Sequence, residues 1–91
     1  MTVRIDGAAV VFELSDVLDS ATGSTLVAAA ESAVIAEPDR VDIDLQQLSD
    51  WTEGGVTSLV RCREICRDLP GGLHYRTGKG PGRDALLAAY S

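Results

Sequence analysis

The sequence predicts an α/β protein with a mixed four-stranded sheet, an N-terminal antiparallel hairpin and about three helices. Between Val41 and Leu45, apolar and acidic residues alternate with the period of two that a strand with one buried face requires. Apolar residues in 20–36 and again in 53–69 recur at helical spacing instead. Near the N-terminus, the turn sequence Asp6-Gly7 separates two short β-prone runs.

The first two strands are expected to pair as the hairpin. Val3 and Ile5 precede the turn, and residues 9–14 follow it. A helix is then expected to about Ala36, with Asp19 or Ser20 as its N-cap, because either side chain can accept a bond from the first free N–H groups. The apolar stripe of this helix consists of Leu26, Val27, Ala30 and Val34.

The third strand, residues 41–45, leads through a short turn into the second helix. Thr52 is expected to cap that helix by accepting a bond from the amide of Gly54 or Gly55. Trp51 and Val56 flank the cap at the spacing of a hydrophobic staple. This spacing favours a packing role for Trp51 over a role as a binding aromatic.

The chain then returns to the sheet and closes with a short helix. The second helix is predicted from Glu53 to about Leu69, where Pro70 and two glycines end it. Residues 73–77 form the expected fourth strand, and a last helix covers 83–90 after a glycine-rich loop. In a sheet of this order, ligands gather where strands end and helices begin.

Length and charge restrict the function classes. The 91 residues are expected to form one domain, 1–91, which buries about 60 to 65% of its unfolded surface. A formal net charge of -6 argues against nucleic acid as the partner and favours a basic protein surface. No apolar run reaches the ~20 residues of a membrane span, and the first residues lack the apolar stretch of a signal peptide. We therefore expect a cytoplasmic protein without membrane insertion.

Two segments carry a family resemblance. Residues 14–19, LSDVLD, match the pattern Leu-x-Gly-x-Leu-Asp with Asp16 in place of glycine and Asp19 retained. Residues 52–55, TEGG, follow a strand that contains Asp44 and Leu45, and they stand where the pattern has Asp-Ser-Ser-Gly. In these motifs and in element order the chain resembles STAS domains, the family that includes the anti-sigma factor antagonists. The resemblance implies helices mainly on one face of the sheet and places the two segments side by side.

The tetrad departs from the family at its phosphorylation site. The antagonists carry their phosphate on the second serine, and that position is Gly54, which has no hydroxyl. Glu53 stands at the first serine and places a fixed negative charge at a helix N-terminus. Thr52, Thr57 and Ser58 remain as candidate acceptors. No efficient phosphorylation switch is expected.

The resemblance implies a non-catalytic interaction module. Such a module would bind an anti-sigma factor of the histidine-kinase-like ATPase type and regulate sigma-factor-dependent transcription in bacteria. The predicted contact residues are Asp19, Thr52, Glu53, Gly54, Gly55 and Ser58. The arginines of the second helix form either a solvated face or a further contact for an acidic patch; they are Arg61, Arg63 and Arg67.

Two alternative functions remain open at this stage, as does homo-oligomerisation. STAS subunits of ABC transporters for phospholipids carry Asp-Thr-Gly-Gly at the tetrad, which Gly54-Gly55 resembles more closely. An accessory subunit on a transporter ATPase is therefore the second hypothesis. The loop 78–83, GKGPGR, has the composition of a phosphate cradle but not the Walker spacing, so a nucleotide or phosphate sensor is the third.

Catalysis, metals and cofactors are not expected. His74 is the only histidine, and no serine has a base at triad spacing. Cys62 and Cys66 share one helix face and are expected to be buried, reduced thiols, because zinc would need further ligands. The acidic residues around the predicted site are expected to be solvated rather than to hold a cation; they are Asp16, Asp19, Asp50 and Glu53.

Overall fold

The computed structural model describes residues 1–91 as four strands and three helices. In chain order they are β1 (Thr2–Asp6), β2 (Ala9–Leu18), α1 (Ser20–Ile35), β3 (Arg40–Trp51), α2 (Glu53–Cys66), β4 (Leu73–Arg76) and α3 (Pro81–Ala89). Element order and type agree with the prediction along the whole chain. The predicted second helix was three residues too long, since α2 ends at Cys66 with Arg67 as its C-cap.

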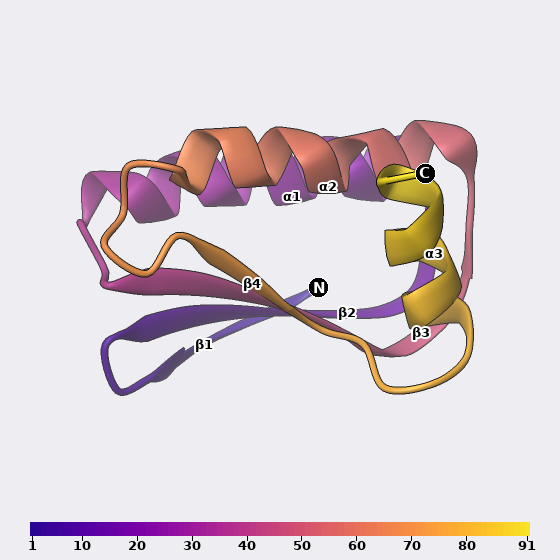
Figure 1. Ribbon diagram of the computed structural model, residues 1–91, viewed down its shortest axis with the longest axis horizontal. Helices are drawn as coiled ribbons and strands as arrows, with labels where there is room; N and C mark the ends of the chain where they lie inside the picture. Colours follow the sequence, from indigo (N-terminus) through magenta and orange to yellow (C-terminus); the bar gives the residue numbers. More distant parts are fainter.

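The four strands form one sheet in the order β1-β2-β3-β4. The β1–β2 pair is antiparallel, and the β2–β3 and β3–β4 pairs are parallel, so the predicted mixed sheet with an N-terminal hairpin is confirmed. Figure 1 shows α1 and α2 side by side on one face of the sheet, with α3 at the end where β2, β3 and β4 finish. The opposite face carries no helix (Figure 1).

Strands β2 and β3 are longer than their alternation predicted. The stretch from Asp16 to Leu18 lies beyond the predicted strand 9–14, yet it continues β2 and pairs with β3. The register shifts on both sides of Asp16, which has a φ of 61°. These irregularities put three exposed residues in succession, 15–17, and so hide the strand period. A positive φ is also the conformation for which glycine is favoured, and aspartate is one of the residues that tolerates it.

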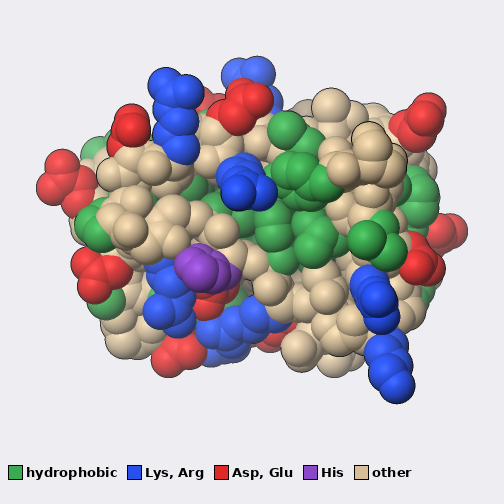
Figure 2. Space-filling model, viewed as in Figure 1, with side chains coloured by type: hydrophobic (Ala, Val, Ile, Leu, Met, Phe, Trp, Pro, Cys, Tyr) green, Lys and Arg blue, Asp and Glu red, His purple; other side chains and the backbone are tan.

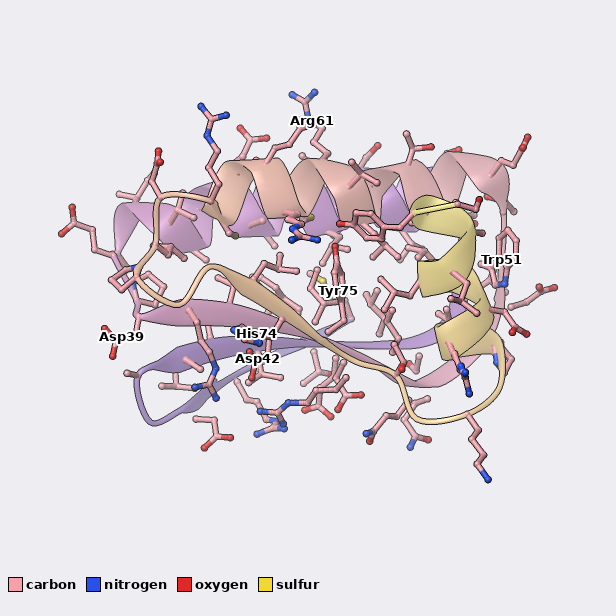
Figure 3. All side chains as sticks on the ribbon, viewed as in Figure 1. Asp39, Asp42, Trp51, Arg61, His74 and Tyr75 are labelled. Carbon is pink, nitrogen blue, oxygen red and sulfur yellow. The ribbon has the colours of Figure 1, made fainter.

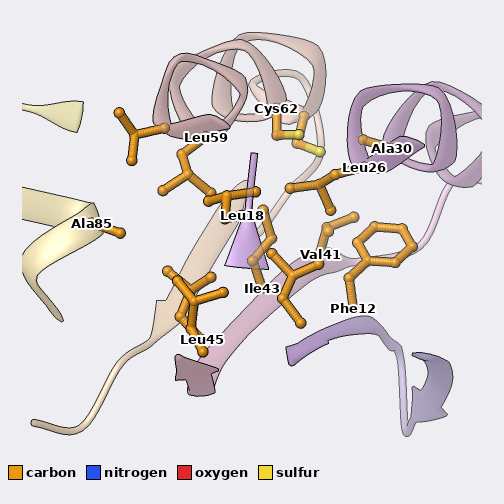
Figure 4. Packing of buried hydrophobic residues seen from close by; sticks show 14 residues of the cluster. Phe12, Leu18, Leu26, Ala30, Val41, Ile43, Leu45, Leu59, Cys62 and Ala85 are labelled. Atoms are coloured by element: carbon orange, nitrogen blue, oxygen red, sulfur yellow. The ribbon is translucent and has the colours of Figure 1, made fainter. Parts of the chain in front are cut away.

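The core lies between the sheet and the helix pair. Fourteen buried residues form one cluster, and Figure 4 shows Leu18, Ile43 and Leu59 meeting at its centre. Cys62 and Cys66 are fully buried there as free thiols, as predicted. Burial, together with the neighbouring Cys66, raises the pKa of the Cys62 thiol to about 12. Both cysteines therefore act as core residues in the folded protein.

Ion pairs cover the face of the sheet that has no helix. Asp42 on β3 is buried beneath two arginines: Arg40 Nε donates to Oδ1 at 3.0 Å and Arg76 to Oδ2 at 2.7 Å. Further pairs join Arg4 to Glu13 and Arg76 to Asp6. Figure 2 shows the molecule from the β4 side, with hydrophobic side chains in the middle of the face in view and charged ones around its margin. The ion pairs thus satisfy a buried carboxylate and keep the open face polar.

We expect Asp42→Asn to lower the free energy of unfolding by about 2 kcal/mol at neutral pH, because a hydrogen bond to a charged group typically contributes about this much to stability. Burial opposes ionisation of Asp42, but the hydrogen bonds from Arg40 and Arg76 outweigh it and lower the carboxyl pKa. Its contribution is therefore complete above the unfolded pKa of about 3.9 and is lost as the pH falls through the lower folded value.

Urea unfolding of both proteins at pH 7 and at about pH 3 measures this effect. The difference in the free energy of unfolding between wild type and Asp42→Asn should be smaller at about pH 3 than at pH 7. Asp44→Asn, on the same strand and face but without an ion pair, serves as the control and should show little deficit at either pH. A deficit of equal size at both pH values would contradict the assignment.

Candidate functional site

The predicted site residues meet where β2 and β3 end and α1 and α2 begin. The backbone N–H of Thr52 donates to the carbonyl of Leu18 at 3.0 Å, which ties the two strand ends together. Asp19 and Ser20 therefore lie directly beside residues 52–55, as the resemblance implied. This rim is at the right of Figures 1 and 3, next to α3. We call it the carboxyl-edge surface, and it consists of Asp19, Ser20, Trp51, Thr52, Glu53, Gly54, Thr57 and Ser58.

Both helices that start at this surface are capped by their predicted side chains. The Thr52 hydroxyl accepts from the N–H of Gly55 at 3.1 Å, and Asp19 Oδ1 accepts from the N–H of Thr22 at 2.9 Å. The bond from the Thr22 amide lowers the pKa of Asp19. Glu53 follows the cap of α2 and is exposed in its first turn. Two carboxylates thus lie at two adjacent helix N-termini, where the helix dipoles favour negative charge.

The cap of α2 gives a direct stability prediction. Thr52→Ala removes the acceptor for the Gly55 amide and should lower the free energy of unfolding by about 1 kcal/mol. Thr52→Ser keeps the oxygen and should stay within a few tenths of the wild type. Urea unfolding curves of the three proteins measure the difference. Equal losses in the two variants would show that the side-chain methyl, and not the cap, is responsible.

The two glycines after Glu53 have different surroundings. Gly54 is exposed and lies against the hydroxyl of Ser20 at the start of α1. Gly55 was predicted to be a contact residue, but it is buried, because α2 packs directly on the backbone of Leu18 and Asp19. Gly55 therefore permits the close approach of helix and strand and cannot itself touch a partner.

A hollow of about 580 Å³ lies beside the acidic start of α2. Its floor is apolar, with Trp51 and Val56 at the predicted staple positions, and α3 forms the other wall with Ala88 and Ala89. Trp51 is half-buried and packs on the core, so it serves the predicted packing role while one side remains open to the hollow (Figure 3). The contribution of α3 was not predicted, because no pattern in the sequence says against which helix it docks.

The arginines of α2 have different roles. Arg63 lies over the ring of Tyr90 at 5.5 Å from its centroid, and the Tyr90 hydroxyl meets that of Tyr75 at 2.9 Å. Tyr75 in turn donates to the carbonyl of Leu59 on α2 (Figure 3). Arg63 therefore helps to fasten the end of α3. Arg61 lines a second hollow of about 300 Å³ between α1 and α2, together with Ser58.

The only histidine of the chain lies away from the carboxyl-edge surface (Figure 3). His74 lies on β4 and its Nε2 is 2.9 Å from the carbonyl of Gly71. No three His, Cys, Asp or Glu side chains are grouped so that they could hold a metal ion. The glycine-rich loop leads into α3 at Gly80, which provides no side-chain cap. The carboxyl-edge surface offers carboxylate and hydroxyl groups beside an apolar hollow.

Comparison with known proteins identifies the fold. No protein-family model and no curated protein sequence matches the chain. Among solved structures it is similar to the unphosphorylated anti-sigma factor antagonist SpoIIAA, with a TM-score of 0.73 and 16% identity over 94% of this chain and 80% of that one. The chain has the STAS fold. The resemblance stated from residues 14–19 and 52–55 is therefore confirmed at the level of fold.

A second solved structure, described as a crystal structure of Mglu, contains a similar unit. Its TM-score is 0.63 with 16% identity over 87% of this chain. The chain spans only 19% of that longer protein, so the similar unit is one part of a larger chain.

None of the helices in this STAS fold combines the length and the apolar composition needed to cross a membrane.

Proposed function

We propose that this STAS domain, residues 1–91, is a non-catalytic interaction module that binds an anti-sigma factor and thereby regulates sigma-factor-dependent transcription. The observation that carries the proposal is the fold shared with an anti-sigma factor antagonist, combined with the meeting of both motif segments at one surface. The proposed partner is a serine kinase of the histidine-kinase-like ATPase type in the bacterial cytoplasm.

The proposed contact is the carboxyl-edge surface. Glu53 provides exposed negative charge at the start of α2, and Asp19 adds a second carboxylate at the start of α1. Thr52, Gly54 and Ser58 are the remaining residues of the proposed contact. Gly55 is buried and lets α2 pack closely on the end of β2. The adjoining apolar hollow would accept a side chain of the partner, and buried apolar contacts of this kind dominate interface energetics. A basic partner surface with one projecting apolar residue fits this arrangement.

The module is proposed to lack a phosphorylation switch. Gly54 offers no hydroxyl at the family position, and Glu53 keeps a negative charge beside it. The two nearby threonine hydroxyls already have partners within α2: that of Thr52 accepts from Gly55, and that of Thr57 donates to the carbonyl of Glu53 at 2.8 Å. Intact-mass analysis after incubation with the captured kinase and ATP should show no added phosphate; stoichiometric phosphorylation would contradict this part of the proposal.

A pull-down from native cytosol tests the class of partner. Wild type, Glu53→Lys and Glu64→Lys serve as baits; Glu64 is an exposed glutamate farther along α2, so its reversal is a matched change of charge. We expect a histidine-kinase-like ATPase with the wild type and with Glu64→Lys, and its loss with Glu53→Lys. Capture that is equal for all three baits would reject the assigned surface.

The absent acceptor also supports a second function, as a constitutive accessory subunit of an ABC-transporter ATPase. A domain that cannot be phosphorylated at Gly54 suits a permanent complex better than a reversible one. In the same pull-down, a transporter ATPase that remains bound through extended washing would favour this function over the antagonist function.

A further inference from the structure

Strand β1 is an edge strand with one side unpaired. It pairs with β2 alone, and all five of its residues are exposed. Val3 and Ile5 are 52% and 71% exposed although they lie on the same face of the sheet as the core residue Phe12. Proteins usually block such edges with proline, lysine or a covering segment. Residues 2–6 contain no proline or lysine, and no element covers their outer side.

An apolar groove runs along the helix side of this edge. It has a volume of about 330 Å³ between the hairpin and α1. Small side chains line the wall formed by α1, which allows another element to approach closely. Six of the seven lining residues are hydrophobic: Val3, Val10, Phe12, Ala29, Ala33 and Ala36, with Ser32 as the exception. On α1, Ile35 follows Ser32 by one helical turn and is 82% exposed.

The charges of β1 are complementary to those of a second β1. On the strand, Arg4 and Asp6 are two residues apart and share the open face. An antiparallel pair centred on Ile5 places Arg4 of each copy opposite Asp6 of the other, and the two Ile5 side chains meet on the groove side. Opposite charges at such cross-strand positions are favourable. A pair centred on Arg4 would instead oppose two arginines, and a pair centred on Val3 would place Arg4 opposite Thr2, so the charges favour the register centred on Ile5.

We propose that two copies of this chain pair through β1, antiparallel and centred on Ile5, into one continuous eight-stranded sheet. Pairing satisfies the free backbone groups of both edges and covers Val3 and Ile5. It also brings the two α1 helices toward each other across the groove. The charge of Arg4 does not prevent this pairing, because Arg4 Nε lies 2.7 Å from Glu13 Oε1 and the two charges compensate each other.

The pairing leaves the carboxyl-edge surfaces free. β1 lies at the edge of the sheet away from β4, whereas the apolar hollow lies between α2 and α3. The dimer therefore presents two identical recognition surfaces, which raises the avidity for a dimeric partner. The proposal stands whether or not the partner is an anti-sigma factor.

Sedimentation equilibrium of the full chain over a concentration series tests the pairing. Wild type should show a monomer–dimer equilibrium, and Arg4→Asp and Asp6→Arg alone should each weaken it at least tenfold, because each places like charges at both contacts. An equimolar mixture of these two variants should restore it, since the strand with two aspartates then pairs with the strand with two arginines. Arg83→Asp, a matched charge change in the first turn of α3, should behave like wild type.

A monomeric wild type at the highest concentration would overturn the proposal, as would dimerisation that neither β1 variant weakens. If both β1 variants fail to dimerise and their equimolar mixture fails as well, the register centred on Ile5 is wrong. Thermal melting of each variant excludes unfolding as the cause, because the replaced side chains are exposed and form only surface ion pairs.

Discussion

Gly55→Ala should lower the free energy of unfolding by about 3 kcal/mol or more. A Cβ at this position would overlap the carbonyl oxygen and carbon of Leu18, which are backbone atoms fixed in the sheet. No rotamer change can relieve the overlap, so α2 would have to move off the end of β2. Overpacking typically costs about 1 to 3 kcal/mol, and a backbone obstacle places this site at the upper end.

The neighbouring Gly54→Ala provides a matched control. There the added Cβ meets the hydroxyl of Ser20, the end of a side chain that can rotate away. Alanine also favours a helix by about 1 kcal/mol over glycine, which offsets the cost of that rotation. Urea unfolding should therefore separate the two variants clearly. A Gly55→Ala protein as stable as Gly54→Ala would mean that helix and strand do not pack this closely.

Glu53→Lys should weaken the affinity for the protein captured in the pull-down by about 100-fold. The substitution reverses the exposed charge at the centre of the carboxyl-edge surface and places a cation at a helix N-terminus. Like charges brought together across an interface cost several kcal/mol, and 100-fold corresponds to about 2.7 kcal/mol. Isothermal titration calorimetry with the captured protein measures the change.

Glu64→Lys again controls for net charge and should keep the affinity within about threefold, since charge changes outside a contact act mainly on the association rate. Glu53→Gln separates loss of charge from its reversal and should give an intermediate affinity. Affinities that fall equally in Glu53→Lys and Glu64→Lys would indicate a diffuse electrostatic attraction rather than the proposed contact.

Local sequence patterns predicted the middle of β3 and the caps of α1 and α2, but not the ends of β2 and β3 that lie at the carboxyl-edge surface. The alternation of 41–45 and the Thr52 cap are short-range signals, and each acts through residues only a few positions apart. The likeness to STAS domains then placed 14–19 beside 52–55, a contact that no periodicity could show.

Features that depend on distant parts of the chain escaped prediction. Asp42 is satisfied by Arg76, 34 residues away, and the docking of α3 rests on contacts among Arg63, Tyr75 and Tyr90. Gly55 was predicted to be a contact residue because nothing local reveals that the backbone of Leu18 lies against it. The extension of β2 was hidden by the irregular register around Asp16.

Amide chemical-shift mapping tests the central claim most directly. The captured partner is added to the isotope-labelled chain, and the perturbed N–H groups are located on the fold. If the carboxyl-edge surface binds the partner, the shifts concentrate in 18–20 and 51–58, with the hollow-facing residues of α3 beside them. Shifts confined to β1 or to the ion-paired face of the sheet, with 51–58 unchanged, would contradict the claim.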